Sequence, residues 1–315
     1  MSPTAALESD VFLIYMALLA GLLALAGATI AGLKWGLKRD VGHAVRSYLG
    51  WLIMIPLVAG CIFLGRVPTI VFFTLLAVFA FKEYARATGL YRDWLMTGVV
   101  YVGIMAVGVV CLVYDPNLDV PGWYGMFMAL PVYVIAAILL IPILRNKAEG
   151  QLQAIGLAAT GFLYIGWMFG HVCFLANAKH AYGYLLYLLV AVEINDVAAF
   201  TCGKLFGRRK FRSEISPNKT WGGAIGGLAV SMVLPWLLHF SFPHFGALEC
   251  LLTGLIVGVG GQLGDLSMSV IKRDVGVKDM GALIRGHGGI LDRIDSLIYS
   301  APLLFHMIRY IHDLG

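Results

Sequence analysis

Charged residues are scarce in this sequence. They make up 13% of its 315 residues, whereas a soluble domain has about 25%. Apolar residues make up 60%, the mean hydropathy is +0.84, and the apolar residues fall in long runs without charge. A hydrocarbon core about 30 Å thick requires helical runs of about 17–25 residues. The composition therefore excludes a soluble globular protein and predicts an all-α, polytopic integral membrane protein.

The apolar runs divide into ten segments, of which the third is short and the last amphipathic. They lack the period-two alternation of a membrane barrel, and backbone groups in lipid must be satisfied internally, so we predict helices. The first segment has no basic residues before it, unlike a signal peptide, and we expect a true span. The predicted spans are residues 11–33, 48–65, 67–81, 94–113, 122–144, 152–177, 183–203, 222–240, 247–268 and 296–312.

The basic residues indicate how these spans are oriented. With the N-terminus outside, the inner loops hold 20 of the 23 Lys and Arg residues, which is the bias of cytoplasmic loops. We therefore expect a protein of the inner or plasma membrane with loops 203–221 and 269–295 in the cytoplasm. The net charge of +5 is explained by this topology and does not indicate nucleic-acid binding.

Cysteine is also scarce, and its placement argues against two kinds of chemistry. No cysteine has a Cys-x-x-Cys partner or a histidine at zinc-ligand spacing, so neither a redox pair nor a zinc site is indicated. All five lie in or beside apolar segments, where we expect plain core residues. They are Cys61, Cys111, Cys173, Cys202 and Cys250.

Polar residues enter the spans only from about residue 190 onward. We therefore predict an N-terminal scaffold over residues 1–150 and a catalytic region over 151–315, with the active site at the cytoplasmic interface. Glu193 and Asp196 lie three residues apart in one span and share a helix face. Ionisable groups in a span are costly. Either a basic partner on another helix or a cation or phosphate–metal site would stabilise them.

The loop that follows contains a cluster of basic residues that an ordinary inner loop explains. Ser216 and Pro217 come next and favour a helix start. Lys219 and Thr220 would then lie near a helix N-terminus, where exposed N–H groups favour a phosphate. The glycines after Trp221 are explained by close helix packing.

Two further groups of residues suit phosphate chemistry. Asp265, Ser269 and Lys272 are spaced by four and three residues, so they line one helix face. Either a site for a metal-bound phosphate or a plain surface stripe explains this spacing. Asp292 and Asp295 begin the last helix, where either the helix dipole or Mg²⁺ coordination accounts for them. Carboxylates, basic side chains and glycine-rich turns together suit phosphoryl-type transfer.

The run from residue 269 to residue 295 resembles the C-terminal motif of the phosphatidate cytidylyltransferases. It has Ser269, Lys272, Arg273, Lys278, Asp279, Gly286, His287, Gly288, Gly289, Asp292, Arg293 and Asp295 at the spacing of that motif. Two shorter elements also resemble the family. They are Asp196, Ala199, Phe200, Gly203 and Lys204, and Ser216, Pro217, Lys219 and Thr220.

The resemblance covers about residues 190–302 and implies a reaction between CTP and phosphatidate that gives CDP-diacylglycerol and diphosphate with Mg²⁺. It implies Asp265 and Asp292 as metal ligands and catalytic residues, with Asp295 as a further or supporting ligand. Lys219 and Lys272 are also expected to be catalytic. The expected substrate contacts are Ser216, Arg273, His287, Asp196 and Ser269. Some members of the family dimerise, so a homodimer is a further expectation.

The chain departs from the family pattern at four positions, which are Gly222, Arg285, Phe200 and Ala198. None is a predicted metal ligand, but Arg285 adds a cation beside the expected site. A cytidylyltransferase that acts on another lipid phosphate, such as an isoprenoid ether lipid, and a non-catalytic paralogue are therefore alternatives. A transporter is a rival from another class, although the chain lacks the internal repeat and midplane site of many transporters.

Overall fold

The computed structural model describes residues 1–36, 41–281 and 288–312, and these residues are overwhelmingly helical. Eight helical stretches are long and apolar enough to cross a membrane, and Trp221–Leu237 is a shorter apolar helix. Each of the ten predicted segments falls on a helix, so the predicted fold class is confirmed. The α-helices are α1 (Pro3–Glu8), α2 (Asp10–Ala31), α3 (Gly42–Leu64), α4 (Arg66–Ala87), α5 (Trp94–Leu112), α6 (Tyr124–Leu144), α7 (Gln151–Thr160), α8 (Phe169–Leu175), α9 (Ala181–Phe206), α10 (Trp221–Leu237), α11 (Ala247–Asp274) and α12 (Leu291–Ile311).

Four short segments complete the described secondary structure. Two are π-helices, η1 (Gly32–Gly36) and η3 (Gly161–Met168), and two are 3₁₀-helices, η2 (Leu90–Arg92) and η4 (His239–Ser241). The segment η3 interrupts the predicted span 152–177 between α7 and α8. Interruptions of this kind are frequent at functional sites.

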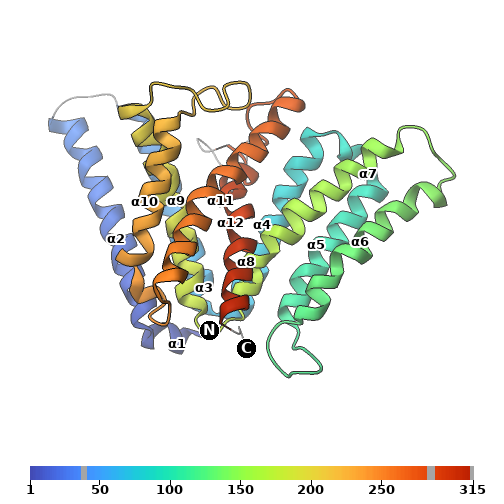
Figure 1. The fold of residues 1–315 in the computed structure, drawn as a ribbon, viewed down its shortest axis with the longest axis horizontal. Coiled ribbons are helices and arrows are strands. Elements are labelled where there is room, and N and C mark those ends of the chain that lie inside the picture. Colours follow the sequence, from blue (N-terminus) through green and yellow to red (C-terminus); the bar gives the residue numbers. More distant parts are fainter. Residues whose placement is uncertain (37–40, 282–287, 313–315) are drawn as a thin grey trace.

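The long helices lie side by side as a bundle (Figure 1). Helix α1 and the end of α12 lie at one end of the bundle, and the loop between α9 and α10 lies at the other. Because α1 and the end of α12 lie at the same end, the arrangement agrees with an even number of membrane crossings. The loops between α4 and α5 and between α6 and α7 also lie at the end that holds the α9–α10 loop.

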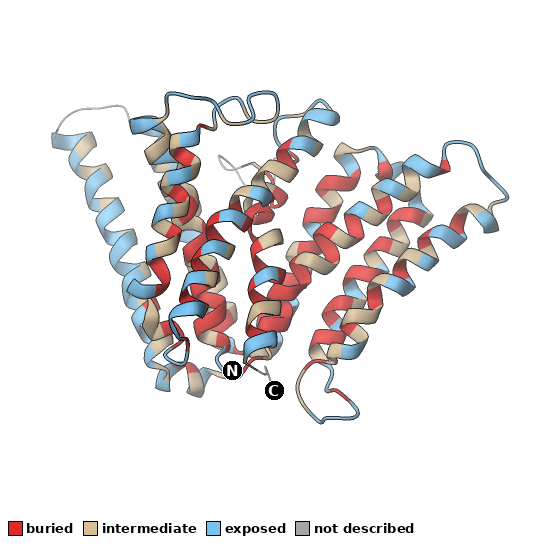
Figure 2. Ribbon diagram, viewed as in Figure 1, coloured by how far each residue is buried: buried red, intermediate tan, exposed pale blue. Residues whose placement is uncertain are grey.

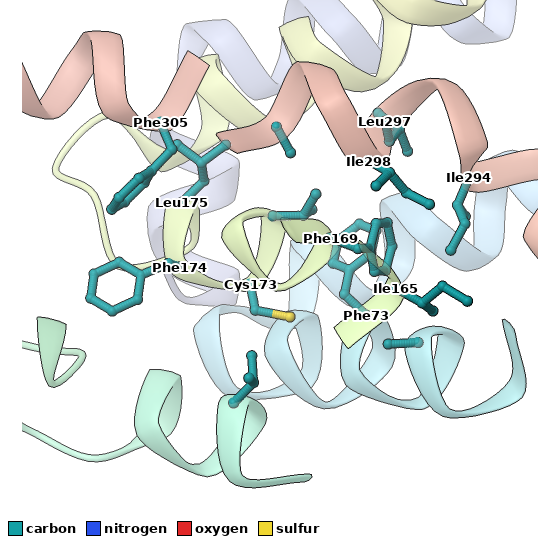
Figure 3. Close-up of a cluster of buried hydrophobic side chains, with 14 of the residues drawn as sticks. Phe73, Ile165, Phe169, Cys173, Phe174, Leu175, Ile294, Leu297, Ile298 and Phe305 are labelled. Carbon is teal, nitrogen blue, oxygen red and sulfur yellow. The ribbon is translucent and has the colours of Figure 1, made fainter. Parts of the chain in front are cut away.

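The most buried part of the bundle is formed by α4, the η3–α8 segment and α12 (Figure 2). Figure 3 shows their side chains interlocking, and the rings of Phe73 and Phe169 meet edge to face with centroids 6.1 Å apart. Because lipid is as apolar as these side chains, helices in a membrane associate through close packing and hydrogen bonds. This core fixes α12 against α4 and so positions the start of α12.

Helices α2 and α3 bury few of their residues. Their apolar side chains stand exposed on the outside of the bundle, as lipid-facing side chains do in a membrane protein. The first predicted span coincides with α2. Helix α4 continues beyond its predicted end at residue 81 as far as Ala87. Hydropathy alone ended that span early because Lys82, Glu83 and Arg86 belong to its last turns.

Candidate active site

Four aspartates from three helices gather at the loop end of the bundle. Asp196 lies on α9, Asp265 on α11, and Asp292 and Asp295 on α12. The carboxylates of Asp196, Asp265 and Asp295 are close enough to repel one another. Such a concentration of negative charge requires cations nearby.

Two lysines neutralise part of this charge. Lys219 Nζ lies 2.7 Å from Asp265 Oδ2. Lys272 Nζ lies 2.9 Å from Asp292 Oδ1 and 4.0 Å from Asp295 Oδ2. The structure thus brings together all five of these predicted residues, although they are spread over 77 positions of the sequence.

A glycine allows α11 and α12 to approach this closely. A methyl group on Gly264 would overlap the carbonyl oxygen of Asp295, so only glycine fits at this contact. The hydroxyl of Tyr164, from η3, donates a 3.0 Å hydrogen bond to the Gly264 carbonyl oxygen. The π-helical segment therefore contacts the same part of α11 that carries Asp265.

Polar neighbours orient Asp196 within the bundle. Ser296 Oγ donates to Asp196 Oδ2 at 3.1 Å. The buried Asn195 accepts a 3.1 Å hydrogen bond from Ser231 Oγ and lies 3.5 Å from Asp196. Glu193 lies near both the Asp196 carboxylate on its own helix and the Arg293 guanidinium on α12, so both explanations for these two carboxylates stay open.

The loop before α10 reaches the aspartates through Lys219. Thr220 caps α10, since its hydroxyl oxygen accepts a 3.1 Å hydrogen bond from Gly223 N–H. The predicted helix start at Ser216 is therefore wrong. The chain from residue 207 to 219 folds back on itself, with Phe211 N–H donating to the Lys219 carbonyl oxygen at 2.9 Å. Lys219 still immediately precedes the helix cap, close to its predicted place.

The remaining predicted residues have different surroundings. Ser269 Oγ donates to Asp265 Oδ1 at 3.3 Å, which confirms that the two residues share a helix face. Arg273 Nε donates to the Ile215 carbonyl oxygen at 3.3 Å and thereby joins α11 to the loop that contains Ser216. No contact of the Ser216 side chain with the aspartates is found among the described residues. His287 and Arg285 lie outside the described residues.

Asp292 also anchors the chain that precedes α12. Its Oδ2 accepts hydrogen bonds from Met280 N–H at 3.1 Å and from Gly289 N–H at 3.0 Å. Gly288 has a φ of +80°, a conformation that favours glycine. The aspartate thus holds the backbone before the glycine-rich motif and at its last residue, and it also pairs with Lys272.

Glu83 was not among the predicted site residues, although it contacts the same segment. Its Oε2 accepts a 3.0 Å hydrogen bond from Leu291 N–H. The available signal was a carboxylate at the end of an apolar run. Glu83 lies within residues 1–150, which are predicted to be scaffold.

A hollow with a volume of about 450 Å³ lies between the loop that joins α4 to α5 and the loop that joins α6 to α7. Asp93 and Arg145 line it and form a bidentate ion pair at 2.6 and 2.7 Å. None of the predicted site residues that the structure describes lines it. The candidate active site therefore remains the aspartate–lysine cluster, which consists of Asp196, Asp265, Asp292, Asp295, Lys219 and Lys272.

Comparison with known proteins agrees with this assignment. A family model described as "Cytidylyltransferase family" matches residues 45–311. A phosphatidate cytidylyltransferase of Staphylococcus haemolyticus is 31% identical over 264 residues, which cover 83% of this chain and 96% of the relative. One of Staphylococcus aureus is 40% identical over 162 residues, which cover 51% of this chain and 60% of the relative.

An Escherichia coli relative bears the name "Uncharacterized protein YnbB". It is 33% identical over 305 residues, which cover 94% of this chain and 97% of the relative. The matched residues 45–311 include every predicted site residue and most of the bundle. The resemblance drawn from the C-terminal motifs is thus confirmed, and the protein belongs to the cytidylyltransferase family.

Proposed function

We propose that this protein condenses CTP with phosphatidate to form CDP-diacylglycerol and diphosphate. The observation that carries the proposal is the convergence of Asp265, Asp292 and Asp295 with Lys219 and Lys272 at one end of the bundle. The name of the Staphylococcus haemolyticus relative, which the match covers almost completely, supports this substrate pair.

The reaction exchanges one phosphorus–oxygen bond for another. A phosphate oxygen of phosphatidate forms a bond to the α-phosphorus of CTP. The bond from that phosphorus to the bridging oxygen breaks, and diphosphate leaves with the electron pair. Such a transfer needs mainly positioning and neutralisation of charge on the phosphate oxygens. Lys219 and Lys272 supply positive charge at the cluster, and Arg273, Ser216 and His287 are the further proposed contacts.

Mg²⁺ is the proposed cofactor, and the chemistry of the donor set suits it. Carboxylate oxygens are the protein ligands that Mg²⁺ prefers. As they stand, the described residues contain no group of three His, Cys, Asp or Glu arranged to hold a metal, and lysine ammonium groups lie against the carboxylates instead. Asp265, Asp292 and Asp295 would hold the ion, which supplies Lewis-acid polarisation and a template for the phosphates.

An apolar groove beside the cluster supports a lipid substrate. It lies between α10 and α11 and has a volume of about 210 Å³. Its lining includes Gly258, Gln262 and Leu266. Leu266 is adjacent to Asp265, and Gly258 and Gln262 lie seven and three residues before Asp265, farther from the loop end of α11. At 1.5 Å per residue, the step from Gly258 to Asp265 is about 10 Å. An acyl chain in this groove would bring its phosphate to Lys219 and Asp265.

The location follows from the charge bias of the loops. We propose that the protein lies in the inner or plasma membrane and that the cluster faces the cytoplasm. CTP is a soluble substrate, and the basic loops are expected on the cytoplasmic side. A homodimer is part of the same proposal. Chemical crosslinking in native membranes, with a dimer band as the expected result, tests it.

Another lipid phosphate is the alternative acceptor, and it is motivated by the four departures from the family pattern, at Ala198, Phe200, Gly222 and Arg285. Supplying purified protein with labelled CTP, Mg²⁺ and either phosphatidate or an isoprenoid ether lipid phosphate separates the two acceptors. We expect the labelled liponucleotide from phosphatidate at the higher kcat/KM. A preference for the ether lipid would replace the proposed substrate.

A further inference from the structure

Glu83 is a buried carboxylate on α4, and only 8% of the residue is exposed. It belongs to the half of the chain that was predicted to be scaffold. Its Oε2 accepts the 3.0 Å hydrogen bond from Leu291 N–H, across 208 residues of sequence. Ile290 N–H also interacts favourably with the carboxylate. A single side chain of α4 thus reaches the first residue of α12.

Among the described residues that directly precede helix α12, none provides a side-chain cap for its N-terminus. Ile290 stands at the cap position, has helical backbone angles and provides no side-chain hydrogen bond. The first N–H groups of a helix have no partners within the helix and require acceptors from elsewhere. Glu83 supplies one of these acceptors, and its negative charge also suits the positive end of the helix dipole.

Two glycines leave room for this carboxylate. A methyl group on Gly281 or on Gly289 would overlap the carboxyl group of Glu83. The backbone before the glycine-rich motif, at Gly281, and at its last residue, Gly289, therefore passes directly against Glu83. The carboxylate occupies a fixed place between these two segments.

Glu83 and Asp292 act on the same stretch of backbone. Asp292 accepts hydrogen bonds from Met280 and Gly289, while Glu83 accepts one from Leu291. Asp292 follows Leu291 directly, so a change in the direction of the first turn of α12 moves the Asp292 carboxylate relative to Lys272. The position of Asp292 in the cluster thus depends on Glu83.

We propose that Glu83 is a positioning residue for the transfer reaction, one that holds the start of α12 so that Asp292 faces Lys272 and the bound phosphates. The expected effect on turnover rests on the proposed function, whereas the expected effect on the structure of α12 does not. Burial of a carboxylate is costly without partners, and Glu83 Oε1 has no hydrogen-bond partner among the described residues. A role limited to stability is a poor explanation for a group buried in this way.

The test compares Glu83→Ala, Glu83→Gln and Tyr84→Phe in the full-length protein. Tyr84→Phe is the matched control, because it removes a partly buried hydrogen bond of the adjacent residue, from Tyr84 OH to the Leu157 carbonyl oxygen at 3.1 Å. Glu83→Gln keeps an acceptor oxygen for Leu291 N–H. The readouts are kcat and KM for both substrates, together with amide hydrogen exchange of peptides that cover residues 288–296.

We expect Glu83→Ala to lower kcat about 10–100-fold, as for other residues that orient a ligand, with KM for CTP and phosphatidate unchanged. Exchange over residues 288–296 should rise about three- to tenfold, because a hydrogen bond is lost. Glu83→Gln should keep kcat and the exchange over residues 288–296 close to the wild-type values. Tyr84→Phe should lower thermal stability but change neither kcat nor exchange in this segment.

Several results would overturn the proposal. Wild-type kcat in Glu83→Ala would do so, and so would equal losses of kcat in Glu83→Ala and Tyr84→Phe. If Glu83→Ala fails to fold, Glu83→Gln decides the matter, and loss of its activity without faster exchange contradicts a positioning role. If the wild-type protein makes no product, the proposed function fails, and exchange alone then tests whether Glu83 holds α12.

Discussion

Lys219 Nζ lies 2.7 Å from Asp265 Oδ2 and joins the loop before α10 to α11. The contact brings together two motifs that are 46 positions apart in the sequence. Both side chains are partly exposed, at 26% and 35%. An exposed ion pair contributes little to stability, so its importance lies in the charge it provides for phosphate oxygens.

Replacing Lys219 by Gln should therefore reduce turnover far more than stability. Loss of one group that stabilises charge in the transition state costs about 10²–10³ in kcat. The thermal midpoint in detergent should stay close to that of the wild type. Lys210→Gln, an exposed lysine of the same loop, serves as the control and should leave kcat unchanged. Equal effects of the two substitutions would remove Lys219 from the active site.

The groove between α10 and α11 predicts a dependence on acyl-chain length. Leu263→Trp fills the groove and should raise KM for a long-chain phosphatidate by about tenfold. KM for a short-chain phosphatidate and for CTP should not change. Leu255→Trp, an exposed position of α11 outside the groove lining, is the control. A KM increase that is the same for both chain lengths would contradict the groove as the acyl site.

Gly264 predicts a packing defect. Gly264→Ala places a methyl group against the Asp295 carbonyl oxygen and should destabilise the protein by about 1–3 kcal/mol, as overpacking does. Turnover should also fall, since Asp265 and Asp295 are forced apart. Gly98→Ala has no atoms within 4 Å of the added methyl group and should be neutral. Thermal unfolding and turnover of both variants provide the check.

The ion pair between Asp93 and Arg145 predicts a pH-dependent contribution to stability. Hydrogen bonds from the Arg145 guanidinium hold the pKa of Asp93 below its ordinary value. A carboxyl group whose pKa is lower in the folded protein stabilises the fold above its unfolded pKa, about 3.9, and loses that effect as the pH falls through the folded value. Arg145→Gln should thus lower the thermal midpoint at pH 6, and the difference from wild type should shrink toward pH 3. A constant difference would exclude this linkage.

The sequence allowed much of the fold to be predicted, because membrane spans are specified by local composition. The end of α4 was missed, since Lys82 and Arg86 dilute the apolar signal while the backbone continues to gain helical hydrogen bonds. The cap of α10 was misplaced for a similar reason. Ser216 and Thr220 are both good caps, and only the fold-back of residues 207–219 onto Lys219 selects the second.

The candidate site was predictable in its members but not in its connections. Asp265, Asp292 and Asp295 were expected from local spacing and from the resemblance. The pairing of Lys219 with Asp265, and of Lys272 with Asp292, depends on how α10, α11 and α12 pack. The role of Glu83 depends on a contact between residues 208 positions apart, which no local pattern encodes.

The central claim is that the aspartate–lysine cluster transfers a cytidylyl group to phosphatidate. It is tested most directly by turnover of purified protein in mixed micelles with phosphatidate, labelled CTP and Mg²⁺. EDTA, Asp265→Asn and Asp292→Asn serve as comparisons. We predict a labelled liponucleotide from the wild type, and none with EDTA or from either folded variant. Equal product from Asp292→Asn, or none from folded wild-type protein with any phosphatidate, would contradict the account.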